Sequence, residues 1–475
     1  MTICFRGSMA KTTFAGELFM LLLAGCGGHA AGEPGDPVRS DATACTQLEG
    51  TGLPVGFRRL NVRDAPYSAA GDGVTDDTTA LQRALDDAAH MPMPSPEHYT
   101  VPSDSGHGGV VFIPAGNYLI ASHLTIPPSV TLMGEFGGPP NASWSPSPSG
   151  ATGAVLLSTA NPGMPNATPF ISLSAGATLE GVSIFYPEQT ETNPPIAYPW
   201  TVRTTGLQAS MIHVALINPF RGVDIASNFA ARFYLRGIYG QPLDQGIAVD
   251  HSLDIGRIED VHFTPIWRGD PASPTLAYQR ASAIAITFLR SDWQIMTDIE
   301  LRGYATGVRF AASPSPCAIA GACGRTNGQF TNLTIDADIG LDIVETANTG
   351  LHVSGYNYST TGASGRYRIP VWQRASSTPN FVTISRAVFE GPIEQAAAWD
   401  SPGCLSLVDT TIGAWNPAKP AIAVHVGQVV VQRTTFAPGN SVAIAMTGNG
   451  RGTATGNTLA GNRITGTVAA AGNTP

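Results

Sequence analysis

The sequence predicts a nearly all-β solenoid of coiled parallel strands, closed at its N-terminal end by one helix. A strand phrase recurs from about residue 150 onward, with about 24 residues between Gly222 and Gly246 and again between Ala283 and Gly307. Hardly any helical periodicity separates the repeats. The chain is 43% hydrophobic and 13% charged, with 53 Gly and 37 Pro, which suits a protein rich in strands and turns.

The N-terminus resembles a bacterial lipoprotein signal. The apolar run "LFMLLLAG" ends at Cys26 in "LAGC", so Cys26 would become the lipidated first residue. This run is shorter than the roughly 20 apolar residues that span a bilayer. The alternative is a cleaved secretory signal with an incidental cysteine. We expect a signal over 1–26, a flexible tether over 27–50 and the solenoid over 51–475.

These features predict an exported protein: an outer-membrane lipoprotein, periplasmic or at the cell surface, or a secreted protein. Contact with a membrane would be made only through the lipid anchor. The chain has a formal charge of −9, and lysine occurs only at Lys11 and Lys419. We therefore expect no nucleic-acid partner. The oligomeric state is left open.

The segment "TDDTTALQRALDDAA" predicts the capping helix. Thr75 would cap it, and Asp76 and Asp77 would lie in its first turn, where the helix dipole favours carboxylates. Such a helix would cover apolar core and unpaired strand edges at the end of the solenoid. Its apolar stripe is expected to contain Leu81, Ala84, Leu85 and Ala88.

One position of the repeated phrase predicts a tight left-handed turn, which Gly, Asn and Asp tolerate best. Asp260 and Asp298 occupy this position, so we interpret them as turn residues in preference to catalysts. His213 and His262 are likewise interpreted as residues of the rungs. The turn position is expected at Gly181, His213, Gly237, Asp260, Asp298 and Asn332.

The strand after this turn position alternates between apolar and other residues. In "GVDIA", Val223 and Ile225 would face the core and Asp224 would face outward. The same alternation in the later phrases predicts one outer sheet face that carries Asp224, Asp250, Thr287, Arg309 and Asp342.

Four cysteines follow the signal. An exported protein meets an oxidising compartment, so disulfides are expected. In "CAIAGAC", Cys317 and Cys323 can close a small loop, which would leave Cys45 and Cys404 as the second pair. Four cysteines allow three pairings. Their spacing does not indicate a zinc site, and no metal site is predicted.

The N-terminal motifs resemble those of a known superfamily. "NVRDAPYSAAGDGVTDDTTALQRALDDAA", "GGVVFIPAGNYLI" and "LTIPPSVTLMGE" resemble the pectate-lyase-like superfamily, in its rhamnogalacturonase/epimerase-like branch. The resemblance is closest over 57–135. It implies a right-handed parallel β-helix, single-stranded in each rung, that handles polysaccharides. The N-T-D, G-H-G and R-I-K signatures of polygalacturonases do not occur in the expected order, so that site is not carried over.

Several carboxylates are candidates for catalysis. Rungs of a solenoid lie about 4.8 Å apart, so carboxylates on neighbouring rungs would have the spacing of a retaining glycosidase, and those two rungs apart would approach that of an inverting one. The alternative is that they are solvated aspartates that cap turns. The candidates for the catalytic acid, base or nucleophile are Asp224, Asp250, Asp254, Asp292 and Glu188.

Aromatic and cationic side chains in the same region are candidates for substrate binding. Tryptophan rings can stack on sugar faces, and arginines can bind hydroxyls or a uronate, although the tryptophans could equally pack under loops. The candidates are Trp267, Arg290, Trp293, Arg309 and Arg257.

We therefore expect an exported enzyme with a polysaccharide substrate, in the first place a glycoside hydrolase that uses paired carboxylates. The first alternative is a lyase or epimerase acting on polyuronates. The second is a non-catalytic carbohydrate-binding or adhesive solenoid. No cofactor is expected for hydrolysis, whereas a lyase could use Ca²⁺ held by loop carboxylates.

Overall fold

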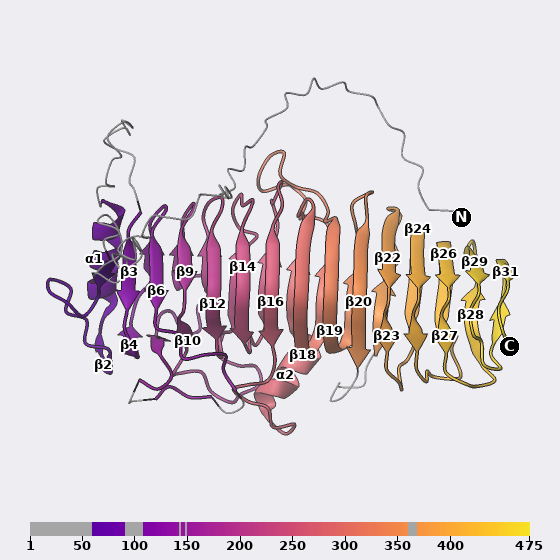
Figure 1. The fold of residues 1–475 in the computed structure, drawn as a ribbon, viewed down its shortest axis with the longest axis horizontal. Coiled ribbons are helices and arrows are strands. Elements are labelled where there is room, and N and C mark those ends of the chain that lie inside the picture. The colour runs from indigo at the N-terminus through magenta and orange to yellow at the C-terminus, as the bar shows by residue number, and fades with distance from the viewer. Residues whose placement is uncertain (1–58, 91–107, 142–143, 148–149, 360–367) are drawn as a thin grey trace, which may run out of the picture. The chain divides into compact units, whose positions relative to one another are not determined.

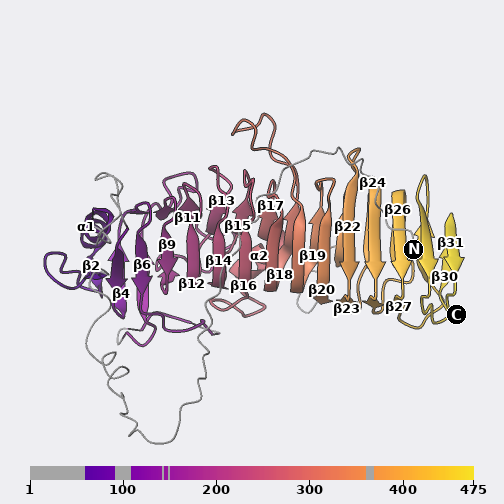
Figure 2. The ribbon, with the colours of Figure 1, turned by 45° about the horizontal axis from the view of Figure 1, so that its top comes forward.

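The computed structural model describes residues 59–90, 108–141, 144–147, 150–359 and 368–475. They form 31 strands and two helices, and the strands stack rung upon rung along the chain (Figures 1 and 2). Every pairing between these strands is parallel, as in the register of β12 with β14 and of β18 with β19. The fold is a right-handed parallel β-helix with an N-terminal capping helix, so the predicted fold class is confirmed.

The strands line up in three stacks, which we call A, B and C. Stack A contains β1 (Arg59–Asn61), β3 (Val110–Ile113), β6 (Thr131–Gly134), β9 (Thr178–Glu180), β12 (Ser210–Leu216), β14 (Tyr234–Gly240), β16 (Arg257–Phe263), β18 (Gln294–Phe310), β19 (Gly328–Ile343), β20 (Leu351–Ser359), β22 (Asn380–Ser385), β24 (Ala397–Val408), β26 (Ile422–Gln432), β29 (Arg451–Thr455) and β31 (Val468–Ala471).

Several of these strands bend and continue into a neighbouring stack. Stack B contains β2 (Asp72–Asp76), β4 (Gly116–Ile120), β7 (Ala154–Ser158), β10 (Ser183–Phe185), the later parts of β12, β14, β16 and β20, the middle of β18 and β19, and then β23 (Val388–Phe389), β25 (Thr411–Ile412) and β27 (Thr435–Phe436).

The third side of each rung forms stack C. It contains β5 (Leu124–Ile126), β8 (Ile171–Leu173), β11 (Trp200–Thr204), β13 (Arg221–Ile225), β15 (Gln245–Val249), β17 (Ile284–Phe288), the ends of β18 and β19, β21 (Ile369–Gln373), the starts of β24 and β26, β28 (Val442–Met446) and β30 (Arg463–Thr465).

A left-handed residue stands at the corner between stacks A and B, as predicted. The backbone φ at this corner is positive at Gly181, His213, Gly237, Asp260, Asp298 and Asn332, with values between 50° and 68°. Two things disfavour a side chain at Gly237. Its φ is 64°, and a Cβ there would lie 2.6 Å from Cδ2 of His213. The turn-forming role predicted for Asp260 and Asp298 is therefore confirmed.

The core consists of side chains that repeat at the same place in each rung. In stack A the inward position is filled by Leu179, Met211, Leu235, Ile258 and Met296, which are all buried. Burying one such side chain contributes about 1.5–3 kcal/mol. No single rung can enclose its own apolar face, so this stabilisation depends on rungs lying on one another.

Helix α1 (Thr78–Ala89) covers the N-terminal end of the stacks, where it packs against β1, β3 and β5 (Figure 1). Its buried residues are the four of the predicted stripe, Leu81, Ala84, Leu85 and Ala88.

The predicted start of this helix was wrong. Asp76 ends β2, and Asp77 is the N-cap residue, so neither lies in the first turn. The buried Asp77 carboxylate accepts hydrogen bonds from the backbone N–H groups of Ala70 (2.7 Å) and Gly71 (2.9 Å). The carboxylate therefore fixes the preceding loop, and the paired aspartates of this segment are structural.

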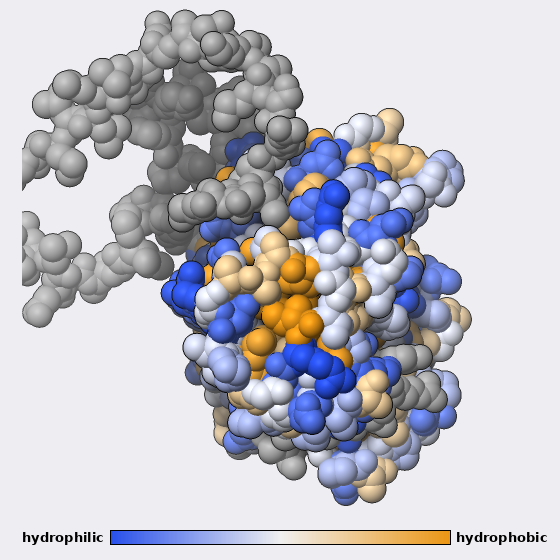
Figure 3. Space-filling model, turned by 90° about the vertical axis from the view of Figure 1, so that its right-hand side faces the viewer, coloured by the Kyte–Doolittle hydropathy of each residue, from blue (hydrophilic) through white to orange (hydrophobic). Residues whose placement is uncertain are grey.

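The opposite end of the stacks, beyond β31, differs from the capped one. Figure 3 looks onto this end and shows apolar surface at its centre, with polar surface around it. The second helix, α2 (Pro274–Ser282), does not cover this end, because it packs against β18 (Figure 1). Neither of the two helices in the described residues has the length and apolar character needed to cross a lipid bilayer.

Candidate functional site

The predicted catalytic residue Asp224 lies on the outward row of stack C, but only 1% of it is exposed. Its carboxylate accepts a hydrogen bond from Arg203 Nε at 2.6 Å. It also accepts the backbone N–H groups of Ala226 and Ser227, both at 2.9 Å. These contacts fix the turn after β13, which is the structural alternative considered for such aspartates. A catalytic role of Asp224 stays untested.

β15 ends at Val249, and Asp250 is buried in the turn that follows, so its place on the outward row stays a prediction. Its carboxylate accepts hydrogen bonds from the Arg290 backbone and from Ser313 Oγ. Asp292 is held by its neighbour Arg290, which donates from Nη2 to Oδ2 at 3.0 Å and from Nε to Oδ1 at 3.3 Å.

Asp254 and Arg257 belong to a separate groove of about 370 Å³. There Asp254 forms an ion pair with Arg232, from Nε to Oδ2 at 2.9 Å. Glu188 is exposed on the loop after β10, where the Tyr198 hydroxyl reaches its Oε2 at 3.5 Å. Burial, followed by the nearby Glu188 charge, raises the pKa of Tyr198, so its hydroxyl stays protonated. The carboxylates predicted for catalysis therefore do not line one common groove.

The predicted sugar-binding tryptophans have different surroundings. Trp267 is buried, packs with Ile217 and Leu243, and lies under the guanidinium of Arg268. Trp267 therefore has a packing role, which is the alternative to stacking on a sugar. Trp293 is 61% exposed and is available to a ligand. Arg309 is engaged by Asp342, with 2.8 Å between Nε and Oδ2.

The outward row of stack C continues beyond the predicted residues. The register pairs Asp224 with Ala248, Thr287 with Arg309, and Arg309 with Asp342. The next positions of the same row are Trp372, Ala398, Ala423 and Ala445. The predicted face is therefore confirmed for Asp224, Thr287, Arg309 and Asp342, and it changes character at Trp372, where small side chains replace charged ones.

A groove of about 560 Å³ lies where the small side chains begin. We call it the Trp372 groove. Its floor is formed by outward alanines on successive rungs, about 4.8 Å apart, and Trp372 stands at one end of them. The lining residues are Trp372, Gln373, Arg374, Ala375, Ala398, Trp399, Asp400, Ala423, His425 and Thr447.

The groove contains an available carboxylate and an imidazole. Among the described residues, no side chain or backbone donor engages the carboxylate of Asp400, whose own N–H donates to Gln373 Oε1 at 2.7 Å. His425 is exposed, and its Nδ1 lies 3.2 Å from Thr447 Oγ1. A carboxylate and an imidazole in one groove can act as general acid and base on a bound substrate.

The Trp372 end of the groove is positively charged. Arg374 donates from Nε and Nη2 to the two oxygens of Asp342, at 2.7 and 3.0 Å, and Arg309 donates to the same carboxylate. The hydrogen bonds that Arg374 donates to Asp342 raise the pKa of Arg374, so the guanidinium carries a full charge. The guanidinium groups of Arg309 and Arg374 thus both bind the buried carboxylate of Asp342. Arg374 also lies 4.6 Å from the ring centroid of Trp372.

A second cluster lies on the outer face of stack B. His262 lies between two carboxylates, 2.9 Å from Asp260 Oδ1 and 2.9 Å from Glu300 Oε2. Tyr239 donates to Asp260, and Arg302 binds Glu300. Burial by itself would raise the pKa of Glu300, but the hydrogen bonds from His262 and Arg302 outweigh it and lower that pKa. The members of this cluster satisfy one another, as expected for a ladder that ties rungs together.

Trp372, Arg374, Asp400 and His425 are not among the residues predicted from the sequence. A signal was present, because "IPVWQ" alternates in the same way as "GVDIA" and places Trp372 outward. The runs "AAAWD" and "AIAVH" carry alanine at the outward position, which resembles core composition and hides the floor of a groove.

Comparison with known proteins agrees with this architecture. Residues 59–203 match the sequence model of the family described as rhamnogalacturonase A/epimerase, pectate lyase-like. Over these residues the chain resembles the pectate-lyase-like superfamily. The matched residues include α1 and the first rungs, and the Trp372 groove lies outside them. A comparison with curated protein sequences gives no match.

Solved structures share the superfamily's fold at low sequence identity. The N-terminal fragment of bacteriophage Phi29 gene product 12 is 11% identical, with a TM-score of 0.50 over 85% of this chain and 67% of that chain. The Streptococcus pneumoniae surface adhesin PfbA is 14% identical, with a TM-score of 0.37 over 88% and 97% of the two chains. The Azotobacter vinelandii mannuronan C-5 epimerase AlgE6 A-module is 14% identical, with a TM-score of 0.34 over 87% and 98%. The Phi29 likeness bears on the fold alone, and the two lower scores add nothing to it.

Proposed function

We propose that the chain processes an acidic polysaccharide, which lies along the outer face of stack C and is held in the Trp372 groove. The observation that carries this proposal is the alanine floor between an aromatic ring and the unengaged carboxylate of Asp400. A flat floor built from repeated rungs suits an extended polymer of repeated units. The superfamily match, to a family named for a rhamnogalacturonase and an epimerase, supports a sugar polymer as substrate.

The charge at the end of the groove supports an acidic sugar. Asp342 neutralises only one of the two guanidinium groups of Arg309 and Arg374, so a net positive charge remains. This charge stands out in a protein with a formal net charge of −9. Nη1 of Arg374 donates no hydrogen bond to Asp342 and can donate one to an oxygen of a uronate carboxylate.

The groups of the groove favour chemistry that begins with removal of a proton next to the uronate carboxylate. Arg374 would neutralise the carboxylate, and His425 or Asp400 would accept the proton, which leads to elimination or epimerisation. Hydrolysis, the first expectation from the sequence, is the second candidate. It uses two carboxyl groups about 5–5.5 or 6.5–9.5 Å apart. Asp400 can supply one of them, and the groove lining contains no second among the described residues.

The test is incubation of the purified chain with a panel of acidic and neutral polysaccharides. Ultraviolet absorbance from an unsaturated product is expected if elimination occurs, and altered uronate stereochemistry by NMR if epimerisation occurs. New reducing ends without absorbance would mean hydrolysis. Asp400→Asn should abolish product, and Trp372→Ala should weaken binding. Binding without product on every polysaccharide would mean a carbohydrate-binding or adhesive protein and would reject the enzymatic proposal.

We also propose that the chain is exported and anchored through lipidated Cys26, a residue outside the described ranges. A disulfide between Cys317 and Cys323 supports an oxidising compartment. Metabolic labelling with a radioactive fatty acid should mark the wild-type protein and not Cys26→Ala. Equal labelling of both would reject the anchor.

A further inference from the structure

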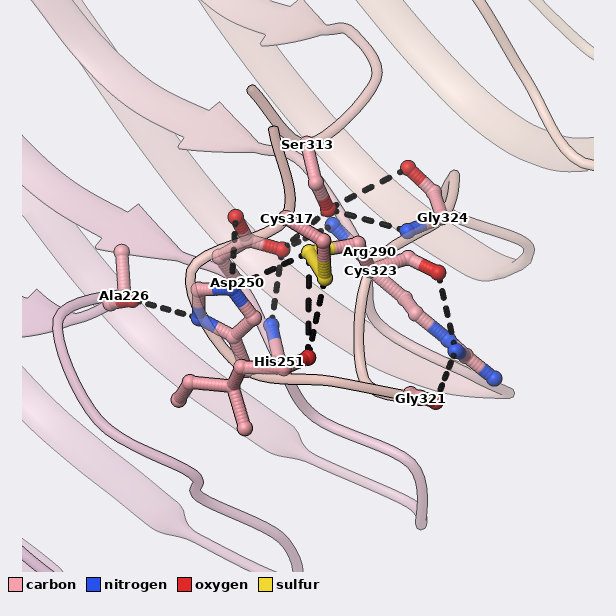
Figure 4. The surroundings of a disulfide bond; sticks show 10 residues. Ala226, Asp250, His251, Arg290, Ser313, Cys317, Gly321, Cys323 and Gly324 are labelled. Carbon is pink, nitrogen blue, oxygen red and sulfur yellow. Dashed lines mark hydrogen bonds and ion pairs between the residues drawn. A yellow bond between two sulfur atoms is a disulfide. The ribbon is translucent and has the colours of Figure 1, made fainter. Parts of the chain in front are cut away.

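The disulfide loop covers a buried cluster that the Trp372 groove does not use (Figure 4). The predicted bond between Cys317 and Cys323 is present in the turn between β18 and β19, with 5.7 Å between the Cα atoms. Beneath it lie His251, which is 4% exposed, and Asp250, which is 1% exposed. His251 Nε2 is 3.5 Å from Cys323 Sγ and 3.6 Å from Asp250 Oδ2.

The imidazole of His251 is oriented as a ligand. Its Nδ1 lies 2.8 Å from the carbonyl oxygen of Ala226. A carbonyl oxygen only accepts hydrogen bonds, so Nδ1 carries a proton, and in the neutral form of the ring Nε2 carries the lone pair. Metal-binding histidines are usually fixed in this way, by donation from the other ring nitrogen to a carbonyl or carboxylate. The lone pair is directed at the sulfur of Cys323 and the carboxylate of Asp250.

The carboxylate of Asp250 is oriented by its other oxygen. Oδ1 accepts hydrogen bonds from His251 N at 2.7 Å, Arg290 N at 3.0 Å and Ser313 Oγ at 2.6 Å. No donor hydrogen bond from the described residues reaches Oδ2, which faces the imidazole. A buried carboxylate oxygen without a donor carries a large desolvation cost unless a cation balances it. With the neutral ring of His251 beside it, this oxygen would be balanced by a metal ion bound between Oδ2 and Nε2.

We propose that reduction of the Cys317–Cys323 disulfide creates a zinc site formed by both sulfurs, His251 Nε2 and Asp250 Oδ2. In tetrahedral zinc sites the Zn–S distance is about 2.3 Å and the Zn–N distance about 2.0–2.1 Å, so neighbouring sulfur and nitrogen ligands lie about 3.5 Å apart. Cys323 and His251 already have this separation. In the disulfide state, no three of the described His, Cys, Asp and Glu residues are placed to hold a metal ion.

The loop is held in place by more than the disulfide. Arg290 Nη1 donates to the carbonyl oxygens of Gly321 and Cys323, both at 3.0 Å. The backbone N–H of Gly324 donates to Ser313 Oγ at 3.0 Å. Cys323 therefore keeps its position after reduction. Cys317 is exposed, so a reductant can reach its sulfur, which then turns away from Cys323 to the spacing of two zinc ligands.

The zinc site forms in two chemical steps, reduction of the disulfide and binding of the metal ion. A phosphine reductant and one water molecule convert the disulfide into two thiols, and the phosphine becomes a phosphine oxide. Zinc ion then binds as the two thiols each lose a proton to solvent, because thiolates are the zinc ligands. Oxidation to the disulfide would expel the metal, so the site is gated by redox state.

The experiment measures zinc bound per chain by anaerobic dialysis against zinc sulfate, before and after treatment with a phosphine. We expect the reduced wild-type chain to bind one more zinc than the oxidised chain. Cys317→Ser and His251→Ala should lose that equivalent, and His425→Ala should keep it. Because the chain contains six cysteines, Cys317→Ser also measures zinc held by the remaining thiols. In the wild type, bound zinc should protect Cys317 and Cys323 from alkylation, read by mass spectrometry of the peptides.

Equal zinc content in reduced wild type and reduced Cys317→Ser would overturn the site, since the metal would then sit on other thiols. Full zinc binding by His251→Ala would overturn the role of the imidazole. If His251→Ala does not fold, as judged by circular dichroism, Asp250→Asn provides the second test. It preserves the size of the side chain, and it should lower the zinc affinity by at least tenfold.

Discussion

The side chain of Gln82 on α1 pairs with both backbone groups of Thr125 on β5. Its Oε1 accepts the Thr125 N–H at 2.9 Å, and its Nε2 donates to the Thr125 carbonyl oxygen at 3.1 Å. Among the described residues, β5 is the first strand of stack C and pairs with one strand, β8, on one side. The amide of Gln82 therefore takes the place of a neighbouring strand and closes an edge that would otherwise be open to another chain.

Replacing Gln82 by alanine should lower the free energy of unfolding by about 1 kcal/mol, because a hydrogen-bonded pair is lost at a partly solvated edge. Chemical denaturation of the purified chain measures this change. Arg83→Ala is the control, since Arg83 is exposed on the same helix and its substitution leaves the pairing intact. An equal change of stability in both variants would show that the edge pairing does not contribute.

The corner between stacks A and B makes a prediction about Asp298, whose φ is 58°. Asp298→Gly should be close to neutral, whereas Asp298→Val should cost about 1–3 kcal/mol, because a β-branched residue is strained at positive φ. Both variants lose the hydrogen bond from Asn332 Nδ2 to Asp298 Oδ1, so their difference isolates the backbone. Thermal unfolding of the two variants measures it, and identical midpoints would contradict the prediction.

The fold was predictable because it depends on patterns that are local in sequence. Positive φ was expected at Asp260 and Asp298 from their position in the repeated phrase and their residue type, and the outward direction of Asp224 followed from alternation with period two. The partners of Asp224 were not predictable in this way. Arg203 lies 21 residues earlier and reaches Asp224 only because one rung stacks on the next. Whether a carboxylate is free or paired is a property of the stack.

The candidate site likewise combines features that are local in sequence with features that depend on how the rungs stack. The sequence predicted the outward row of stack C, on which the Trp372 groove also lies, and its candidate residues are on rungs where charged residues are frequent. In those rungs charged side chains pair with one another, as Arg203 does with Asp224. The groove lies where the outward residues are alanines, and an absence of large side chains gives no local signal. The start of α1 was misplaced because Asp77 binds the backbone of Ala70 and Gly71, a contact outside the helix.

The substitution Asp224→Asn tests whether Asp224 has a catalytic role or a structural role. The substitution removes the charge that pairs with Arg203, and breaking a buried ion pair costs up to about 3–5 kcal/mol. We expect reduced stability, with product formation retained at a temperature where the variant stays folded. Asp400→Asn should show the opposite result, with normal stability and no product. Loss of product in a fully stable Asp224→Asn variant would return the catalytic role to Asp224.

A larger apolar side chain at the floor of the Trp372 groove would fill the groove and leave every polar group unchanged. Ala398 points outward between Trp372 and Ala423 in the register. Ala398→Leu should therefore fill the groove and weaken polysaccharide binding at least tenfold, about 1.4 kcal/mol, with little change in stability. Ala445→Leu is the matched control, because Ala445 lies in the same outward row but outside the groove lining. Equal binding by both variants, measured by calorimetry, would place the polymer elsewhere.

Glu394 makes a prediction about pH. Hydrogen bonds from Lys419 first, and then from Asn416, lower the pKa of Glu394 below its ordinary value of 4.5. An acid whose pKa is lower in the folded state stabilises the fold above its unfolded pKa, and it loses that contribution as the pH falls through the folded pKa. Glu394→Gln should therefore be less stable than wild type at pH 7. The difference should shrink as the pH falls below 4.5 and vanish under more acidic conditions.

The size of this difference at pH 7 should be below about 1 kcal/mol, because the Lys419 ammonium, 2.8 Å from Oε1, is half-exposed and screened by water. Denaturation curves of both proteins between pH 7 and pH 3 measure it. Glu390→Gln, in the same exposed turn, is the control for removal of one negative charge, since no described side chain binds Glu390. A difference that persists unchanged at acidic pH would mean that packing, and not the ion pair with Lys419, sets the contribution of Glu394.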